Sequence, residues 1–166
     1  LIINLQDGAS IFSKSAFNFN GSKENPIKIL SPSQNGGGIV ILDSDSQSQF
    51  SNTIFTDLSS PNMGASGLTA SLTFYNTSAL LKNCSFLSNR SEDYLNLVHS
   101  EYELIDSDFI SVHSDALDSD FSNGKIINSF FNNIGNDAVD FSGSSATLSQ
   151  INIDGVGDKA LSAGEM

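Results

Sequence analysis

Acidic residues recur every 22 positions in the second half of the chain. One column holds Asp93, Asp115 and Asp137 and ends at Lys159. Two further columns run beside it: Asn96, Asp118, Asp140 and Ser162, and Glu92, Ser114, Asn136 and Asp158. If residues one repeat apart become neighbours in the fold, their ionised carboxylates repel one another by about 1 kcal/mol in water, and by more where water is excluded. The protein must offset this repulsion, and each way of doing so implies a different chemistry.

A bound cation is one way to offset the repulsion. Ca²⁺ takes roughly six to eight oxygen ligands from flexible carboxylates and carbonyls. If the acidic segments are strands, Asp118, Asp120 and Asp140 share one outer face, because alternate residues of a strand point the same way. These three residues are the predicted metal ligands, and Ca²⁺ is the one cofactor that the sequence suggests.

Protonation of one carboxylate is a second way to offset the repulsion. A carboxyl group that keeps its proton at neutral pH is a candidate general acid, and glycoside hydrolysis needs such an acid beside a carboxylate. Asp115, Asp137 and Asp118 are the catalytic candidates if the protein is an enzyme. Every stacked acidic column meets the required spacing, however, so the spacing leaves open whether there is any activity.

Two structural explanations compete with these sites. The side chains of Lys159 and Arg90 can pair with the neighbouring carboxylates. Alternatively, Asp93, Asp115 and Asp137 lie at corners of the fold and accept backbone N–H bonds. The corner explanation accounts less well for Asp118, Asp120 and Asp140.

Residues next to the acidic columns are the candidates for binding a polysaccharide. They are Arg90, Glu92, Tyr94, Asp158 and Lys159. The ring of Tyr94 can stack on a sugar or can simply cover a turn with its hydroxyl in water, and the second interpretation is favoured. His99 and His113 have no serine elbow or metal-ligand spacing around them, so a solvent-exposed role is expected for His113.

The acidic columns belong to a longer internal repeat. Two apolar columns share its spacing: Ile41, Leu72, Leu95, Leu117, Val139 and Leu161, and, fourteen residues later, Phe55, Phe86, Phe109, Phe131 and Ile153. A polar column stands three residues before the second one: Asn52, Asn83, Asp106, Asn128 and Gln150. Stacked amides of this kind can hydrogen-bond from one coil to the next. A 22-residue unit cannot bury its own apolar face, so it must stack on copies of itself.

The predicted fold is all-β, a right-handed single-stranded parallel β-helix of about six to seven 22-residue coils with few or no helices. A leucine-rich repeat lacks its own spacing here, and an antiparallel sandwich does not require both columns in register. Residues 1–166 are expected to form a single β-helix domain, part of a longer solenoid. Residues 1–40 form irregular coils, and residues 41–166 form regular coils with an insertion near 59–69.

Several segments resemble a known group of β-helices. The strings GSKENPIKI, NRSEDYLNLV, HSDALDSDF, NGKIINSFFNNIGNDAVDFSGS and GDKALSAGE resemble a β-helix family of the pectin-lyase-like superfamily, including segments that accompany CotH-type spore-coat domains of bacteria. The resemblance covers roughly residues 20–165. It implies an extracellular or cell-surface bacterial protein with additional domains in the same polypeptide, and a polysaccharide or cell-wall glycan as partner.

The superfamily also contains enzymes, and SDALD, GNDAVD and GDKALSAGE are similar to the NTD, GDD and GHG motifs of its polygalacturonases. The differences are substantial. Asn136 replaces the first paired aspartate, Asp158 stands at the histidine position, and no R-I-K motif follows. The expected function is therefore a non-catalytic module that binds or displays carbohydrate. The alternative is a polysaccharide-active enzyme, a glycoside hydrolase or a lyase or epimerase, that uses the stacked Asp columns.

Composition excludes some partners. The chain of 166 residues has 19 acidic and 7 basic residues and a net charge of −12, so nucleic acid and anionic membrane surfaces are not expected to bind. No apolar run approaches the roughly 18 residues of a membrane span, so membrane insertion is not expected either. Cys84 is the single cysteine, which excludes a disulfide within the chain.

Overall fold

Three parallel sheets make up the structure, a computed structural model that describes residues 1–62 and 67–164. The first sheet contains β1 (Ile2–Asn4), β4 (Ile27–Leu30), β7 (Thr53–Leu58), β10 (Ser85–Asn89), β13 (Asp108–Val112), β16 (Phe130–Ile134) and β19 (Asn152–Val156). The second contains β2 (Ile11–Ser13), β5 (Ile39–Leu42), β8 (Ala70–Tyr75), β11 (Asp93–Val98), β14 (Asp115–Asp120), β17 (Val139–Ser142) and β20 (Leu161–Ala163). The third contains β3 (Asn18–Asn20), β6 (Ser48–Ser51), β9 (Ser78–Lys82), β12 (Glu101–Ile105), β15 (Asn123–Ile127) and β18 (Ser145–Ser149).

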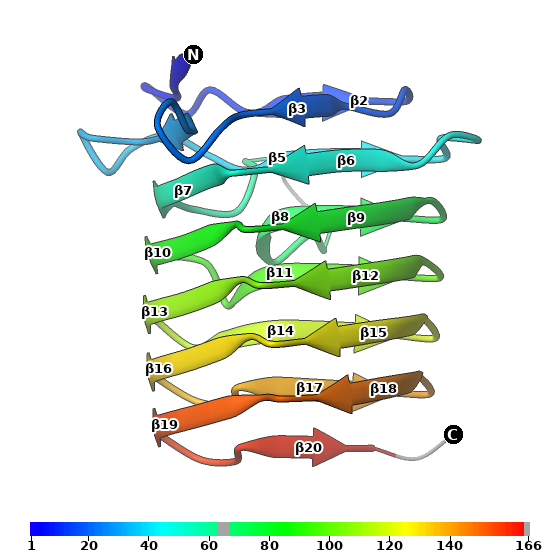
Figure 1. Cartoon of the computed structure of the whole chain (residues 1–166). Coiled ribbons are helices and arrows are strands. Elements are labelled where there is room, and N and C mark those ends of the chain that lie inside the picture. Colours follow the sequence, from blue (N-terminus) through cyan, green and yellow to red (C-terminus); the bar gives the residue numbers. More distant parts are fainter. Residues whose placement is uncertain (63–66, 165–166) are drawn as a thin grey trace.

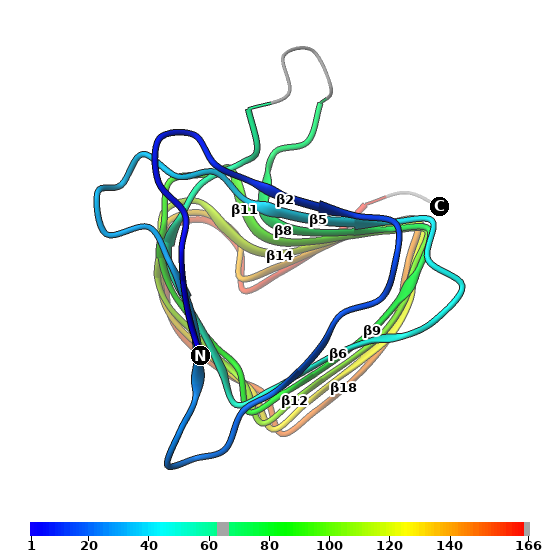
Figure 2. The same ribbon diagram turned by 90° about the horizontal axis from the view of Figure 1, so that it is seen from above.

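Each complete coil contributes one strand to each sheet, and successive coils stack along one axis (Figure 1). Seen from the N-terminal end, the chain runs clockwise as it recedes from the viewer, so the solenoid is right-handed (Figure 2). These features confirm the predicted all-β parallel β-helix. The described ranges contain no helix with the length and apolar character needed to cross a membrane.

The second apolar column forms a continuous row inside the first sheet. The rings of Phe55, Phe86, Phe109 and Phe131 stack face to face, with successive centroids 5.1, 4.3 and 4.9 Å apart. All four side chains are fully buried, and Ile153 continues the row beyond Phe131. The prediction of one stacked phenylalanine row is confirmed.

The first apolar column lies in the second sheet, where Leu95 pairs with Leu72 on one side and Leu117 on the other. The prediction that Ile41 belongs to this column was wrong. Leu72 pairs with Ile39, whereas Ile41 lies two positions further along β5. The connection from β7 to β8 breaks the 22-residue repeat at this point, so counting along the sequence does not give the register across it.

Each coil turns through a residue with a left-handed backbone. The predicted polar column lies at one such corner, with φ between 47° and 56° at Asn52, Asn83, Asp106, Asn128 and Gln150. Asn and Asp tolerate this conformation better than most residues. A side-chain bond between coils joins Asn128 to Asp106 at 2.7 Å, whereas the Asn52 amide donates to the Gly21 carbonyl. The column therefore selects polar residues mainly through turn geometry.

The second sheet bends near the beginning of its strands (Figure 2). The register passes from the pair Asp93 and Asp115 directly to the pair Leu95 and Leu117, and it leaves Tyr94 out of the ladder. Such an interruption lets two successive side chains point to the same side. Tyr94 and Leu95 are accordingly both in the core.

Candidate functional site

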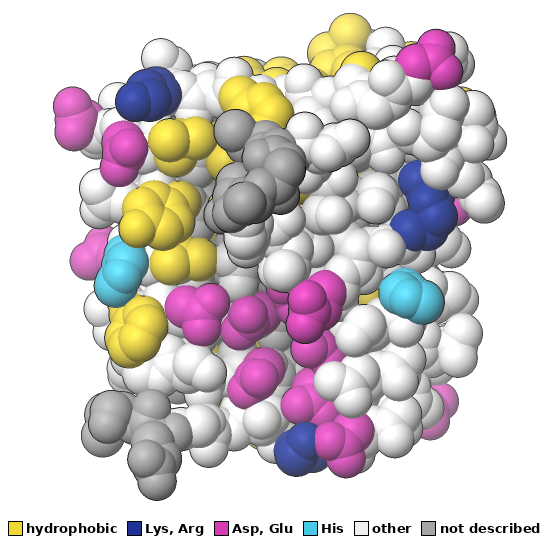
Figure 3. All heavy atoms as spheres, turned by 180° about the vertical axis from the view of Figure 1, so that it is seen from behind, with side chains coloured by type: hydrophobic (Ala, Val, Ile, Leu, Met, Phe, Trp, Pro, Cys, Tyr) yellow, Lys and Arg dark blue, Asp and Glu magenta, His cyan; other side chains and the backbone are white. Residues whose placement is uncertain are grey.

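Carboxylates gather on the outer side of the second sheet (Figure 3). The predicted columns exist as pairs in the sheet: Asp93 with Asp115, Asn96 with Asp118, and Asp118 with Asp140. The structure therefore brings these residues together. Asp93 is only 4% exposed and Asp118 and Asp140 are half-buried, so this surface is less open to water than the alternation predicts.

Asp115 and Asp137 hold the corners of the coils that follow them. Oδ1 of Asp115 accepts the backbone N–H of Asp137 at 2.8 Å and the amide of Asn136 at 2.7 Å. Oδ1 of Asp137 in turn accepts the backbone N–H of Lys159 at 2.8 Å. The Lys159 ammonium lies 3.5 Å from the other oxygen of Asp137. Both carboxylates thus act in the way that the corner explanation predicts.

Asp118 has an environment that disfavours its charged form. Burial, followed by the charges of Asp120, Asp93 and Asp140, raises its pKa from 3.8 to about 7. Asn96 offsets part of this effect because its Nδ2 donates to Asp118 at 2.9 Å and to Asp120 at 3.1 Å. A carboxyl group with this pKa holds a proton for much of the time at neutral pH, which is a property that a general acid needs.

Asp93, like Asp118, has an environment that disfavours its charged form. Burial is the largest cause that raises its pKa from 3.8 to about 6, and the charges of Asp115, Glu92 and Asp120 add to it. The hydroxyl of Thr69 donates to Oδ2 of Asp93 at 2.6 Å and opposes the shift. Repulsion within the acidic surface is therefore met by protonation and by neutral donors, together with the Lys159 pair.

The predicted metal ligands Asp118, Asp120 and Asp140 lie in this surface. Within residues 1–62 and 67–164, no group of three or more Asp, Glu, His or Cys side chains is arranged to hold a metal ion. The three carboxylates lie near one another without forming a ready-made calcium site.

Tyr94 was expected at the surface, and the structure corrects this. Its ring is 0% exposed and lies edge-on to Phe86 and Phe109. Its hydroxyl donates to the Leu87 carbonyl at 3.2 Å. Both interpretations that placed Tyr94 against solvent or sugar are therefore wrong, because the interrupted ladder turns the side chain into the core.

The other predicted polysaccharide contacts occupy different places. Asp158 and Lys159 form an exposed ion pair at the last corner of the acidic column. Glu92 is exposed beside Asp93. The backbone N–H of Arg90 donates to the Leu58 carbonyl at 2.9 Å at the corner that follows the first sheet. The five residues thus do not converge on one site.

An exposed aromatic stripe borders the acidic surface, and sequence reasoning missed it. It consists of Tyr75, His99 and Phe121, with His99 edge-on to Tyr75 at 6.2 Å and stacked on Phe121 at 5.2 Å. Tyr75 is 41% and Phe121 61% exposed. Asp120 directly precedes Phe121 in the chain, and apolar side chains and a histidine line one side of the acidic surface in Figure 3.

The signal for the stripe was present in the repeat. Phe121 occupies the same repeat position as Asn76 and Gly143, which are turn-forming residues, and all three have positive φ. A turn position directs its side chain away from the core, and a left-handed backbone strains a bulky residue.

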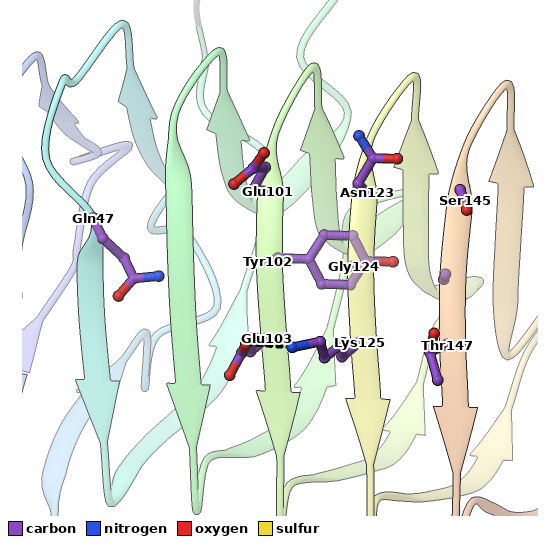
Figure 4. A pocket seen from close by; sticks show the side chains of 10 residues that line it. Gln47, Glu101, Tyr102, Glu103, Asn123, Gly124, Lys125, Ser145 and Thr147 are labelled. Atoms are coloured by element: carbon purple, nitrogen blue, oxygen red, sulfur yellow. Dashed lines mark hydrogen bonds and ion pairs between the residues drawn. The ribbon is translucent and has the colours of Figure 1, made fainter.

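A shallow cavity of about 320 Å³ lies on the outer face of the third sheet (Figure 4). Its rim is polar, and Lys125 pairs with Glu103 at 3.0 Å. Tyr102 fills the space left by Gly124 in the next coil, because a Cβ at Gly124 would collide with the tyrosine ring. The Tyr102 hydroxyl donates to Ser119 at 3.3 Å inside the solenoid, so its ring is a packing group.

Comparison with protein-family models, curated proteins and solved structures finds no match to this chain. The parallel β-solenoid is therefore established by the structure alone, and membership of the pectin-lyase-like superfamily stays a prediction from the sequence.

Proposed function

We propose that this chain is a non-catalytic β-helix module that binds carbohydrate through the aromatic stripe and the carboxylates beside it. The observation that supports this is the exposed stack of Tyr75, His99 and Phe121. Exposed aromatic faces are costly in water and offer a flat apolar surface to the C–H face of a sugar ring. Neighbouring carboxylates such as Asp120 accept hydrogen bonds from sugar hydroxyls.

The negative charge of the protein limits the class of glycan that it can bind. The net charge of −12 and the acidic surface next to the stripe repel polyanionic chains. Neutral glycans and glycans with free amino groups fit this surface better than uronic-acid polymers. This preference also argues against a pectin-like substrate, in spite of the resemblance to polygalacturonase motifs.

The wider setting of the module is part of the proposal. The segments that resemble CotH-associated β-helices support a place in a larger bacterial protein that is secreted or attached to the cell surface. In that setting the solenoid holds the stripe at a fixed distance from the remaining domains and displays it to cell-wall material. Calcium is the proposed accessory cation, because bound Ca²⁺ would relieve repulsion between Asp118 and Asp140.

The enzyme alternative is supported by the burial of the Asp118 carboxyl beside Asp120, Asp93 and Asp140, which raises its pKa to about 7. Against it, Asp115 and Asp137 each use a carboxylate oxygen to hold a backbone N–H. A hydrolase on this surface would therefore depend on Asp118 as acid and on Asp140 or Asp120 as its partner.

Binding and turnover should be measured together on a panel of neutral, amino-sugar and uronic-acid polysaccharides. The proposal expects retention on neutral or amino-sugar polymers, weakened in Phe121→Asn, with no new reducing ends or unsaturated products. Turnover that disappears in Asp118→Asn or Asp140→Asn would establish the enzyme alternative instead. If Phe121→Asn is retained as strongly as the wild type, the aromatic stripe is not part of the binding surface.

A further inference from the structure

A positively charged side chain is enclosed at the corner between the first and second sheets. The two terminal guanidinium nitrogens of Arg90 are closed off from solvent and have no hydrogen-bond partner among the described residues. The ion pairs found within residues 1–62 and 67–164 involve Lys125 and Lys159 instead. Buried charged groups in folded proteins are normally paired, so the guanidinium lacks the acceptor that its position calls for.

Arg90 lines a cavity of about 210 Å³. Ser59, Ser60 and Asn62 also line the cavity, together with the Gly36–Gly37 backbone. A Cβ at Gly36 would collide with the Leu5 carbonyl, so the chain segments around the cavity are already tightly packed. The cavity is therefore a defined space between loops.

The lining has the character of an anion site. Of the described residues that line this cavity, Arg90 carries the single charge and none is a carboxylate. The cavity on the third sheet, by contrast, is bordered by Glu101 and Glu103. In a chain with a net charge of −12, a cavity that combines a guanidinium with neutral side chains repels a negative group less than the acidic surface does.

We propose that the Arg90 cavity binds a small oxyanion, a carboxylate or phosphate group. The guanidinium, whose terminal nitrogens are enclosed and held by no hydrogen bond among the described residues, turns into the cavity as the main partner of the anion. Guanidinium donors match the geometry of both groups and bind them through paired hydrogen bonds. The hydroxyls of Ser59 and Ser60 are additional neutral donors. The cavity is smaller than the roughly 300–1,000 Å³ of pockets for drug-sized ligands, so it fits the anionic group itself rather than a long chain.

This site is separate from the aromatic stripe and does not depend on glycan binding. Its test is the melting temperature of the whole chain in phosphate, in acetate and in chloride, at one pH and one ionic strength. The expected result is a saturable rise with phosphate or acetate relative to chloride, and the stronger of the two identifies the class of oxyanion. Isothermal titration with the same salts gives the dissociation constant directly.

Two variants separate a bound anion from general screening. Arg90→Met keeps the length and apolar stem of the side chain and removes the charge, and it should weaken anion binding by about tenfold or more. Lys125→Met removes an equal charge from an exposed ion pair and should keep the wild-type response. No specific rise in the wild type, or the same rise in Arg90→Met, would overturn the proposal.

Arg90→Lys provides a further check in case Arg90→Met folds poorly. Lysine keeps the charge but loses the paired donors, so the anion response should persist in reduced form. A response equal to that of the wild type would show that the guanidinium geometry plays no part, which also contradicts the proposal.

Discussion

The amide of Asn96 donates a hydrogen bond of 2.9 Å to the carboxylate of Asp118, its neighbour in the next coil. This pair shows how the β-helix tolerates a stack of acidic residues on one sheet. A neutral donor occupies one position of the column, and Asp118 lies next to it with a pKa of about 7. Burial thus keeps part of the negative charge of this surface neutralised by a proton at neutral pH.

Stability should fall as pH rises from about 4 to above 7. The folded-state pKa values of Asp118, about 7, and Asp93, about 6, lie above the ordinary value of 3.8. The folded state therefore binds more protons than the unfolded state in this window, and the free energy of unfolding decreases with pH. The contribution of both groups is fully present below pH 3.8 and is lost as pH passes through 6 and 7.

Urea unfolding of Asp118→Asn at pH 5 and pH 8 measures this effect. The variant should be more stable than the wild type at pH 8 and should gain little at pH 5. Asp154→Asn, on an exposed residue of the first sheet, is the matched control and should leave the pH dependence intact. A wild-type chain that is equally stable at both pH values would contradict the prediction.

Calcium should raise the melting temperature more at pH 8 than at pH 5. A proton on Asp118 competes with the metal at the lower pH, whereas at the higher pH the ionised carboxylates gain from a bound cation. Scans with calcium and with chelator at constant ionic strength separate binding from screening. Identical scans, or a shift that remains in the Asp118→Asn/Asp140→Asn double variant, would show that protonation and Asn96 are sufficient.

Phe109→Ala should destabilise the fold by about 3–5 kcal/mol, because it opens a cavity between two stacked rings. Phe109→Asp should prevent folding, since it places an unpaired charge in the same row. Chemical unfolding followed by circular dichroism measures both. Phe12→Ala, on an exposed side chain, should change stability by no more than about 0.5 kcal/mol. Equal losses at the two positions would contradict the continuous aromatic row.

Phe121→Asn should separate binding from folding. Asparagine tolerates the left-handed backbone at this corner, where φ is 49°, so the variant should be at least as stable as the wild type. It should nevertheless lose most of its retention on glycan, because the stacking face is gone. Ile2→Asn, on an exposed apolar residue of the first sheet, should keep full retention. Affinity electrophoresis with the retained polymer compares the three proteins.

Asp115→Ala should cost about 1–3 kcal/mol, whereas Asp115→Asn should be close to neutral. The alanine variant leaves the Asp137 N–H and the Asn136 amide without their acceptor, and asparagine retains an acceptor oxygen. Thermal unfolding of the two variants gives the comparison. Equal destabilisation would mean that the charge of Asp115, rather than its hydrogen bonds, stabilises the corner.

The fold and the main columns could be predicted from the 22-residue repeat. In a solenoid, residues one repeat apart in sequence become neighbours in space, so a 22-residue period directly predicts that Phe86, Phe109 and Phe131 stack. The same logic placed Asp118 beside Asp140. No long-range information beyond the period was needed for these contacts.

Features that do not follow the repeat could be recognised only in the folded chain. The register between Ile39 and Leu72 depends on the path of an insertion, and the burial of Tyr94 depends on an interruption in one strand ladder. The exposure of Phe121 follows from a corner, where a side chain points outward whatever its hydrophobicity. The pKa of Asp118 and the isolation of Arg90 arise from burial by neighbouring coils and loops, and burial is a property of the packed structure rather than of the repeat.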